Sequence, residues 1–120
     1  MNNRSLGGEK EQMAIDFLRE KGYFIIESNF RVRQAEIDIV ARDGATIVFV
    51  EVKYRSTSKT GHPLDAVDYR KQQKISRAAL SYLNKNKISI DNTSIRFDVI
   101  GILDKEITHI ENAFLFRGDF

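Results

Sequence analysis

The sequence predicts a single α/β domain in which a mixed β-sheet is flanked by two helices. Two segments carry apolar residues at helical spacing, and five others are rich in Ile, Val and Phe, as strands are. These segments follow one another in the order α-β-β-β-α-β-β. The 120 residues suffice for one hydrophobic core, and no repeat, low-complexity tract or linker divides residues 1–120.

The first helix is expected over residues 9–21, where apolar positions recur at helical spacing and Gly22 follows as a C-terminal cap. Three strands are expected next, at residues 23–33, 36–42 and 45–55. Between the last two, Asp43-Gly44 indicates a tight hairpin turn. That turn would place Asp38 opposite Phe49 on the neighbouring strand.

The second half of the chain begins with a predicted mobile loop, because residues 56–63 contain Ser, Thr, Gly and the only proline. A second helix is expected from about residue 64 or 68 to residue 86, with one apolar and one basic face. Two strands, at residues 94–103 and 107–116, complete the domain.

The overall composition excludes several classes of site. The net charge of +2 combines 19 basic with 17 acidic residues, so it is weak evidence for a nucleic-acid partner. The absence of cysteine excludes disulfides, thiolate metal sites and cysteine nucleophiles. Residues 1–8 lack the apolar run of a signal peptide, and no stretch approaches the roughly 20 apolar residues of a membrane span. We therefore expect a cytoplasmic protein with no membrane partner.

Asp38, Glu51 and Lys53 are the candidate catalytic residues. Alternation along residues 45–55 places Glu51 and Lys53 on one strand face, and the expected register puts Asp38 one diagonal step from Glu51. Diagonal Cβ separations of about 7 Å suit two carboxylates that share a divalent cation. Oxygen ligands favour Mg²⁺ or Mn²⁺, and Lys53 beside the ion would orient water or stabilise negative charge. Such a layout is typical of phosphodiester hydrolysis.

The same three residues have a second interpretation, a cross-strand ion-pair cluster on a solvated sheet face. Against it, the strand around Glu51 is otherwise apolar and therefore expected to be central and buried, where unpaired carboxylates are costly without a cation. The residue pattern alone leaves both interpretations open.

Glu36-Ile37-Asp38 and Glu51-Val52-Lys53 resemble the motif of the PD-(D/E)xK nuclease superfamily, an acidic residue on one strand before E-x-K on the next. Nearly the whole chain resembles the YraN family of small restriction-endonuclease-like proteins, which are similar in pattern to archaeal Holliday-junction resolvases. Further matching stretches are Gly8-Glu9, Ala41–Gly44, Phe49-Val50 with Arg55, Ala66-Val67, Arg70–Gln73, Arg96–Val99 and His109–Phe114. Ala35 departs from the glycine usual in the family.

The resemblance implies a restriction-endonuclease-like fold in which Asp38 and Glu51 bind the metal, with the carbonyl of Val52 as a third ligand. Lys53 would be the catalytic lysine. The activity implied is a metal-dependent endonuclease acting on DNA, with branched DNA as one candidate substrate. Cleavage of two strands would need two active sites and hence a symmetric homodimer.

Two further site residues rest on the resemblance. Glu9 corresponds to an extra acidic residue that binds the metal directly or through water, although a charge at a helix N-terminus, worth under about 1 kcal/mol, would also explain it. Gln73, or Lys74 beside it, matches a helix position that faces the site in related nucleases, although exposed polar residues on helices usually have no such role. Asp98 shares a strand face with Arg96, which fits a buried structural pair and a site role equally well.

Basic residues accompany the acidic ones and are candidates for DNA phosphate contacts, although a run of charges is usually only a solvated face. These candidates are Arg31, Arg33, Arg55, Lys59, Lys71 and Lys74. Two alternatives to the enzyme are a non-catalytic nucleic-acid-binding module with the same fold and a protein-interaction domain. The latter would expose an apolar patch, for which residues 113–116 are the candidate.

Overall fold

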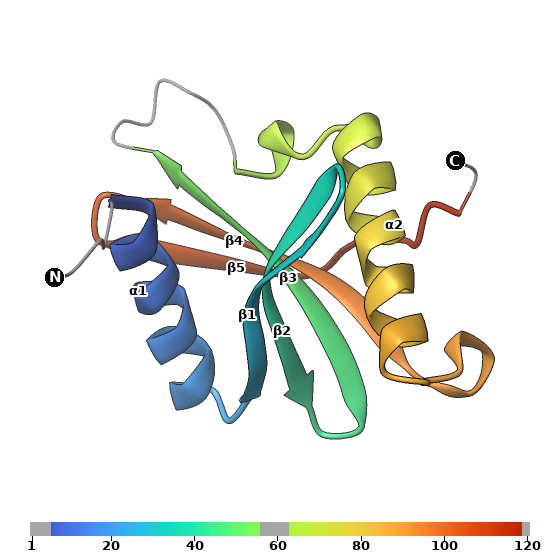
Figure 1. Cartoon of the computed structure of the whole chain (residues 1–120). Coiled ribbons are helices and arrows are strands. Elements are labelled where there is room, and N and C mark those ends of the chain that lie inside the picture. Colours follow the sequence, from blue (N-terminus) through green and yellow to red (C-terminus); the bar gives the residue numbers. More distant parts are fainter. Residues whose placement is uncertain (1–5, 56–62, 119–120) are drawn as a thin grey trace, which may run out of the picture.

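The computed structural model describes residues 6–55 and 63–118. Two helices and five strands follow one another there in the predicted order (Figure 1). Their bounds are α1 Leu6–Glu20, β1 Phe24–Val32, β2 Ala35–Asp43, β3 Thr46–Arg55, α2 Tyr69–Lys85, β4 Ile95–Leu103 and β5 Glu106–Phe114. Short 3₁₀ helices, η2 Pro63–Ala66 and η3 Ile90–Asn92, precede α2 and β4 respectively. None of the described helices is long and apolar enough to cross a bilayer.

The strands form one sheet in the order β1-β2-β3-β4-β5. β3 and β4 are parallel, and the other neighbours are antiparallel, so the predicted mixed sheet is confirmed. Parallel neighbours need a crossover connection, which α2 provides. α1 covers one face of the sheet and α2 the other (Figure 1). This α/β arrangement is consistent with a restriction-endonuclease-like fold.

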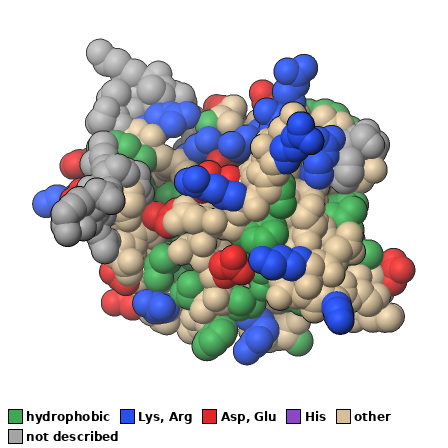
Figure 2. All heavy atoms as spheres, in the orientation of Figure 1, with side chains coloured by type: hydrophobic (Ala, Val, Ile, Leu, Met, Phe, Trp, Pro, Cys, Tyr) green, Lys and Arg blue, Asp and Glu red, His purple; other side chains and the backbone are tan. Residues whose placement is uncertain are grey.

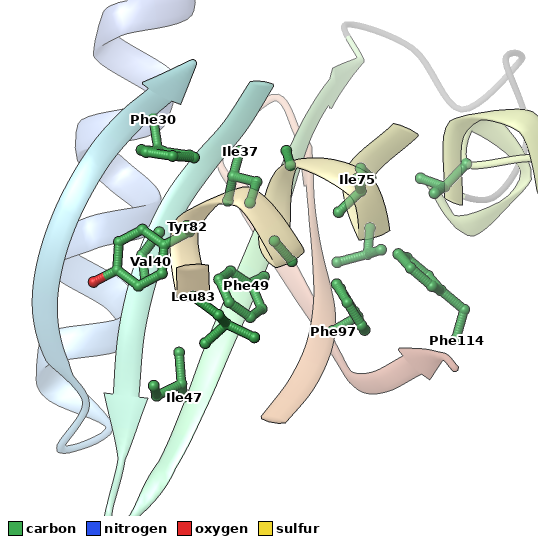
Figure 3. Close-up of a cluster of buried hydrophobic side chains, with 14 residues drawn as sticks. Phe30, Ile37, Val40, Ile47, Phe49, Ile75, Tyr82, Leu83, Phe97 and Phe114 are labelled. Carbon is green, nitrogen blue, oxygen red and sulfur yellow. The ribbon is translucent and has the colours of Figure 1, made fainter. Parts of the chain in front are cut away.

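Each face of the sheet carries its own hydrophobic core. The core beneath α2 joins aromatic rings from four strands to Tyr82 and Leu83 of the helix (Figure 3). Phe97 stacks between Phe49 and Phe114, with ring centroids 5.6 and 5.0 Å away. The core beneath α1 includes Leu18 of that helix. Because the sheet is covered on both faces, the central strands are apolar on both sides.

The C-terminal strand ends at Phe114, two residues earlier than predicted. Phe114 is buried, and Ala113 and Phe116 pack against the core beneath α2. Only Leu115 of residues 113–116 is largely exposed, at 67%. The apolar patch expected for a protein-interaction domain is therefore not formed by this stretch.

The β2–β3 hairpin differs from the predicted one in its turn. Gly44 and Ala45 form the turn, Asp43 pairs with Thr46, and Val40 rather than Asp38 lies opposite Phe49. Gly44 has φ +62°, which glycine adopts at little cost, and it occupies the first of the two turn positions. The expected register was therefore wrong by two residues, because the glycine begins the turn instead of ending it.

Candidate active site

Strands β2 and β3 part at Asp38. The last residues of the two strands that pair are Ile39 and Val50. Beyond this pair, Oδ2 of Asp38 accepts a hydrogen bond of 2.7 Å from the backbone N–H of Val52. Ile37 packs in the core beneath α2, whereas Ile39 packs beneath α1, although regular alternation would place both on one face. The backbone irregularity between them turns the Asp38 carboxylate away from the cores, and this side chain replaces a backbone acceptor for Val52.

A cavity of about 390 Å³ lies in front of Asp38, between α1 and the ends of β1, β2 and β3. Its described lining combines three acidic side chains with two basic ones. The residues are Gly8, Lys10, Glu11, Asn29, Arg31, Glu36, Asp38, Val52 and Tyr54. Nζ of Lys10 lies 4.5 Å from the centre of the Tyr54 ring, so the lysine covers one wall. A polar ligand of small size can therefore reach the Asp38 carboxylate.

Glu51 and Lys53 reach toward α2. Glu51 is 5% exposed, and its Oε2 lies 3.1 Å from Nζ of Lys53 and 3.4 Å from Nζ of Lys71, which α2 supplies. Neither Glu51 nor Lys53 lines the cavity in front of Asp38. The three predicted catalytic residues thus lie in the region where β2 and β3 separate. Asp38 lines the cavity on the α1 side, whereas Glu51 and Lys53 point toward α2.

The two predicted metal ligands interact electrostatically. Burial and, second, the negative charge of Glu51 together raise the pKa of Asp38 to about 7. The hydrogen bond from the Val52 N–H opposes both effects because it favours the ionised carboxylate. Asp38 is therefore a carboxyl group whose negative charge is disfavoured in the absence of a cation.

Glu11 of α1 lines the cavity, whereas Glu9, the residue predicted for the site, is exposed on the helix and does not line it. Oε1 of Glu11 accepts a hydrogen bond of 2.9 Å from the side chain of Asn29. Burial raises the pKa of Glu11, the bond from Asn29 counteracts this, and the charge of Glu36 raises it further. The sequence pattern did not identify Glu11. Glu9 and Glu11 lie two residues apart on α1 and so point in directions about 200° apart, and only the packing of the helix shows which of them faces the sheet.

The remaining predicted residues are more scattered. Arg31 lines the cavity and pairs with Glu36 at 3.5 Å, whereas Arg55 donates a hydrogen bond to the carbonyl of Tyr54. Gln73 is half-buried on α2 and does not line this cavity. Arg33 and Lys74 are exposed and line neighbouring cavities. Lys59 lies outside the described residues.

The donor atoms at Asp38 and Glu51 suit a magnesium-like ion only with help from other ligands. No group of three or more His, Asp or Glu side chains among residues 6–55 and 63–118 is placed to hold a metal ion. The predicted set has two carboxylates and the Val52 carbonyl. Mg²⁺ is usually held by one or two carboxylates together with waters and substrate oxygens, so this number of protein ligands fits.

Asp98, which the sequence left with two interpretations, belongs to a buried structural network. Its carboxylate accepts hydrogen bonds from Arg96 at 2.9 and 3.1 Å, from the Asn112 N–H at 2.9 Å, and contacts Nε2 of His109 at 2.7 Å. Burial acts to raise the pKa of Asp98, but these hydrogen bonds outweigh it and hold the pKa below its ordinary value. All these partners join strands β4 and β5, which supports the structural interpretation.

Comparison with known proteins places the chain among relatives of similar length. The model of the uncharacterised protein family UPF0102 matches residues 10–102, which include Asp38, Glu51 and Lys53. The UPF0102 protein of Thermodesulfovibrio yellowstonii is 52% identical over 109 residues, which cover 91% of this chain and 95% of the relative. A UPF0102 protein of Alkaliphilus oremlandii is 47% identical over 93% and 99% of the two chains. A UPF0102 protein of Clostridioides difficile is 46% identical over 95% of this chain and 100% of the relative.

Proposed function

The chain belongs to the uncharacterised protein family UPF0102, the YraN family, and we propose its function from the geometry of the site. The protein is a divalent-metal-dependent nuclease that hydrolyses phosphodiester bonds in DNA. The observation that carries this proposal is the Asp38 carboxyl group, which lies where β2 and β3 separate. Its burial and the negative charge of the buried Glu51 raise its pKa. Such a pair is costly unless a cation neutralises it.

Asp38, Glu51 and the carbonyl of Val52 would hold Mg²⁺ or Mn²⁺. When bound, the ion would neutralise phosphate charge and make a water molecule a better nucleophile. The residues of the chain then have separate tasks. Lys53, 3.1 Å from Oε2 of Glu51 and 22% exposed, lies in a partly desolvated place, from which it stabilises charge that develops on the phosphate. Lys10 and Arg31, on the cavity wall, bind phosphate oxygens.

The test is a nuclease assay with linear, branched and single-stranded DNA in Mg²⁺, in Mn²⁺ and in EDTA. We expect cleavage with metal, no cleavage in EDTA, and no cleavage by Asp38→Asn or Glu51→Gln purified in the same way. Preference for branched DNA would support the finer, resolvase-like proposal, which also predicts a dimer in sedimentation experiments. A wild-type preparation that leaves all three DNAs intact with both metals contradicts the proposal.

A non-catalytic nucleic-acid-binding module is the second candidate, and two ion pairs favour it. Glu51 already forms ion pairs with Lys53 and Lys71, which neutralise its charge without a metal. Calorimetric titration with Mn²⁺ separates the two candidates. The nuclease requires binding that Asp38→Asn and Glu51→Gln weaken, whereas the module predicts DNA binding with neither metal uptake nor cleavage.

A further inference from the structure

Two further cavities adjoin the one in front of Asp38. A second cavity, of about 530 Å³, shares Arg31 and Glu36 with the first. A third, of about 360 Å³, shares Val32 and Gln34 with the second. The three cavities therefore adjoin one another around the β1–β2 hairpin, from Asp38 to α2. We call this series of cavities the hairpin trough.

The charge along the hairpin trough changes sign from one end to the other. Among the described residues around Asp38, acidic side chains outnumber basic ones. In the described lining of the second cavity, Arg31, Lys71 and Lys74 accompany one acidic side chain, Glu36. The third cavity is lined by Arg33 and Arg77 and, among the described residues, by no acidic side chain. Figure 2 shows Lys and Arg side chains gathered over the upper part of the face, where Figure 1 has the β1–β2 turn and the start of α2, beside a smaller group of acidic ones.

The basic side chains stand on both walls of the hairpin trough. Arg31 and Arg33 belong to the β1–β2 hairpin, and Lys71, Lys74 and Arg77 belong to α2. A chain of phosphates that lies between these walls is neutralised from two sides. The described lining of the second and third cavities contains no aromatic side chain on which an unpaired base could stack. The lining therefore suits phosphates whose bases are already paired elsewhere.

We propose that the hairpin trough holds one backbone of a DNA duplex, with the phosphates beside the target bond running toward Arg33 and Arg77. The proposal rests on the proposed function, because it takes the bond at Asp38 as the target. Binding in the trough does not depend on base sequence, since its basic side chains contact phosphates, which carry no sequence information. The acidic end receives its phosphate only when a metal ion neutralises it.

The test compares two variants that each lose three exposed positive charges. The trough variant carries Arg33→Ala, Lys74→Ala and Arg77→Ala, and the control variant carries Arg19→Ala, Lys85→Ala and Lys105→Ala. Fluorescence anisotropy in EDTA measures binding of two duplexes of unrelated sequence, and of one of their single strands, over a series of salt concentrations. For the trough variant we expect the plot of log affinity against log salt to become less steep, by about 0.9 for each phosphate that the protein no longer neutralises, and equally for both duplexes. Lys74→Ala alone should reduce the steepness of this plot by about one.

Several outcomes would overturn the proposal while leaving the nuclease untouched. The trough is wrong if the trough variant binds duplex like the wild type or no worse than the control variant. It is also wrong if the wild type binds the single strand more tightly than the duplex. Conversely, loss of duplex binding in the trough variant, together with a wild type that cuts no DNA with either metal, supports the trough and contradicts the nuclease.

Discussion

Replacing Asp38 by asparagine should stabilise the metal-free protein, and should do so more at pH 8 than at pH 5. The reason is the raised pKa of this carboxyl group, about 7 instead of 3.8, which burial and the charge of Glu51 cause. A tenfold change in proton affinity corresponds to about 1.4 kcal/mol, so ionised Asp38 costs the folded state about 4 kcal/mol above pH 7. Asparagine carries no charge and can still accept the N–H of Val52.

The sign follows from the proton count in the two states. In the unfolded chain Asp38 loses its proton near pH 3.8, whereas in the folded protein it keeps the proton until about pH 7. Between these values the unfolded state binds fewer protons, so the free energy of unfolding decreases as the pH rises. At pH 5 the cost has reached only about 2 kcal/mol, so the advantage of Asp38→Asn should grow by roughly 2–3 kcal/mol between pH 5 and pH 8.

Urea unfolding in EDTA at the two pH values measures this advantage. Asp91→Asn, at an exposed position, is the matched control and should change little at either pH. Saturating Mg²⁺ should reduce the pH dependence of the wild type, because a bound cation replaces the proton. An advantage of Asp38→Asn that is equal at pH 5 and pH 8, or a loss of stability at pH 8, would refute the electrostatic reasoning.

Three further substitutions probe other parts of the molecule. Asp98→Ala should lower the free energy of unfolding by about 3–5 kcal/mol at pH 7, since Arg96 loses its buried partner, and denaturant titration measures it. Gly44→Ala should cost about 1 kcal/mol in the same assay, because alanine tolerates φ +62° poorly. Lys53→Ala should reduce DNA cleavage by orders of magnitude and change DNA affinity little, which single-turnover kinetics and anisotropy separate; equal rates would exclude a catalytic role.

Local patterns in the sequence determined the elements and their order. Helices and strands have periods of 3.6 and 2.0 residues, which the apolar positions repeat directly, so every predicted element is present to within a few residues. The same alternation correctly placed Glu51 and Lys53 on one face of β3, where Lys53 pairs with Glu51. Each of these features depends on neighbours in the chain, and for that reason it can be predicted without the fold.

The tertiary structure alone decided how the elements meet. Lys71 contacts Glu51 because α2 crosses over β3, and Glu11 reaches the cavity because α1 packs in one particular rotation. The break at Asp38 arises where the β2–β3 ladder ends, which depends on a turn that the sequence pattern placed one residue too early. Such contacts join residues far apart in the chain, and packing and backbone geometry select them from many arrangements that the same local periodicity allows.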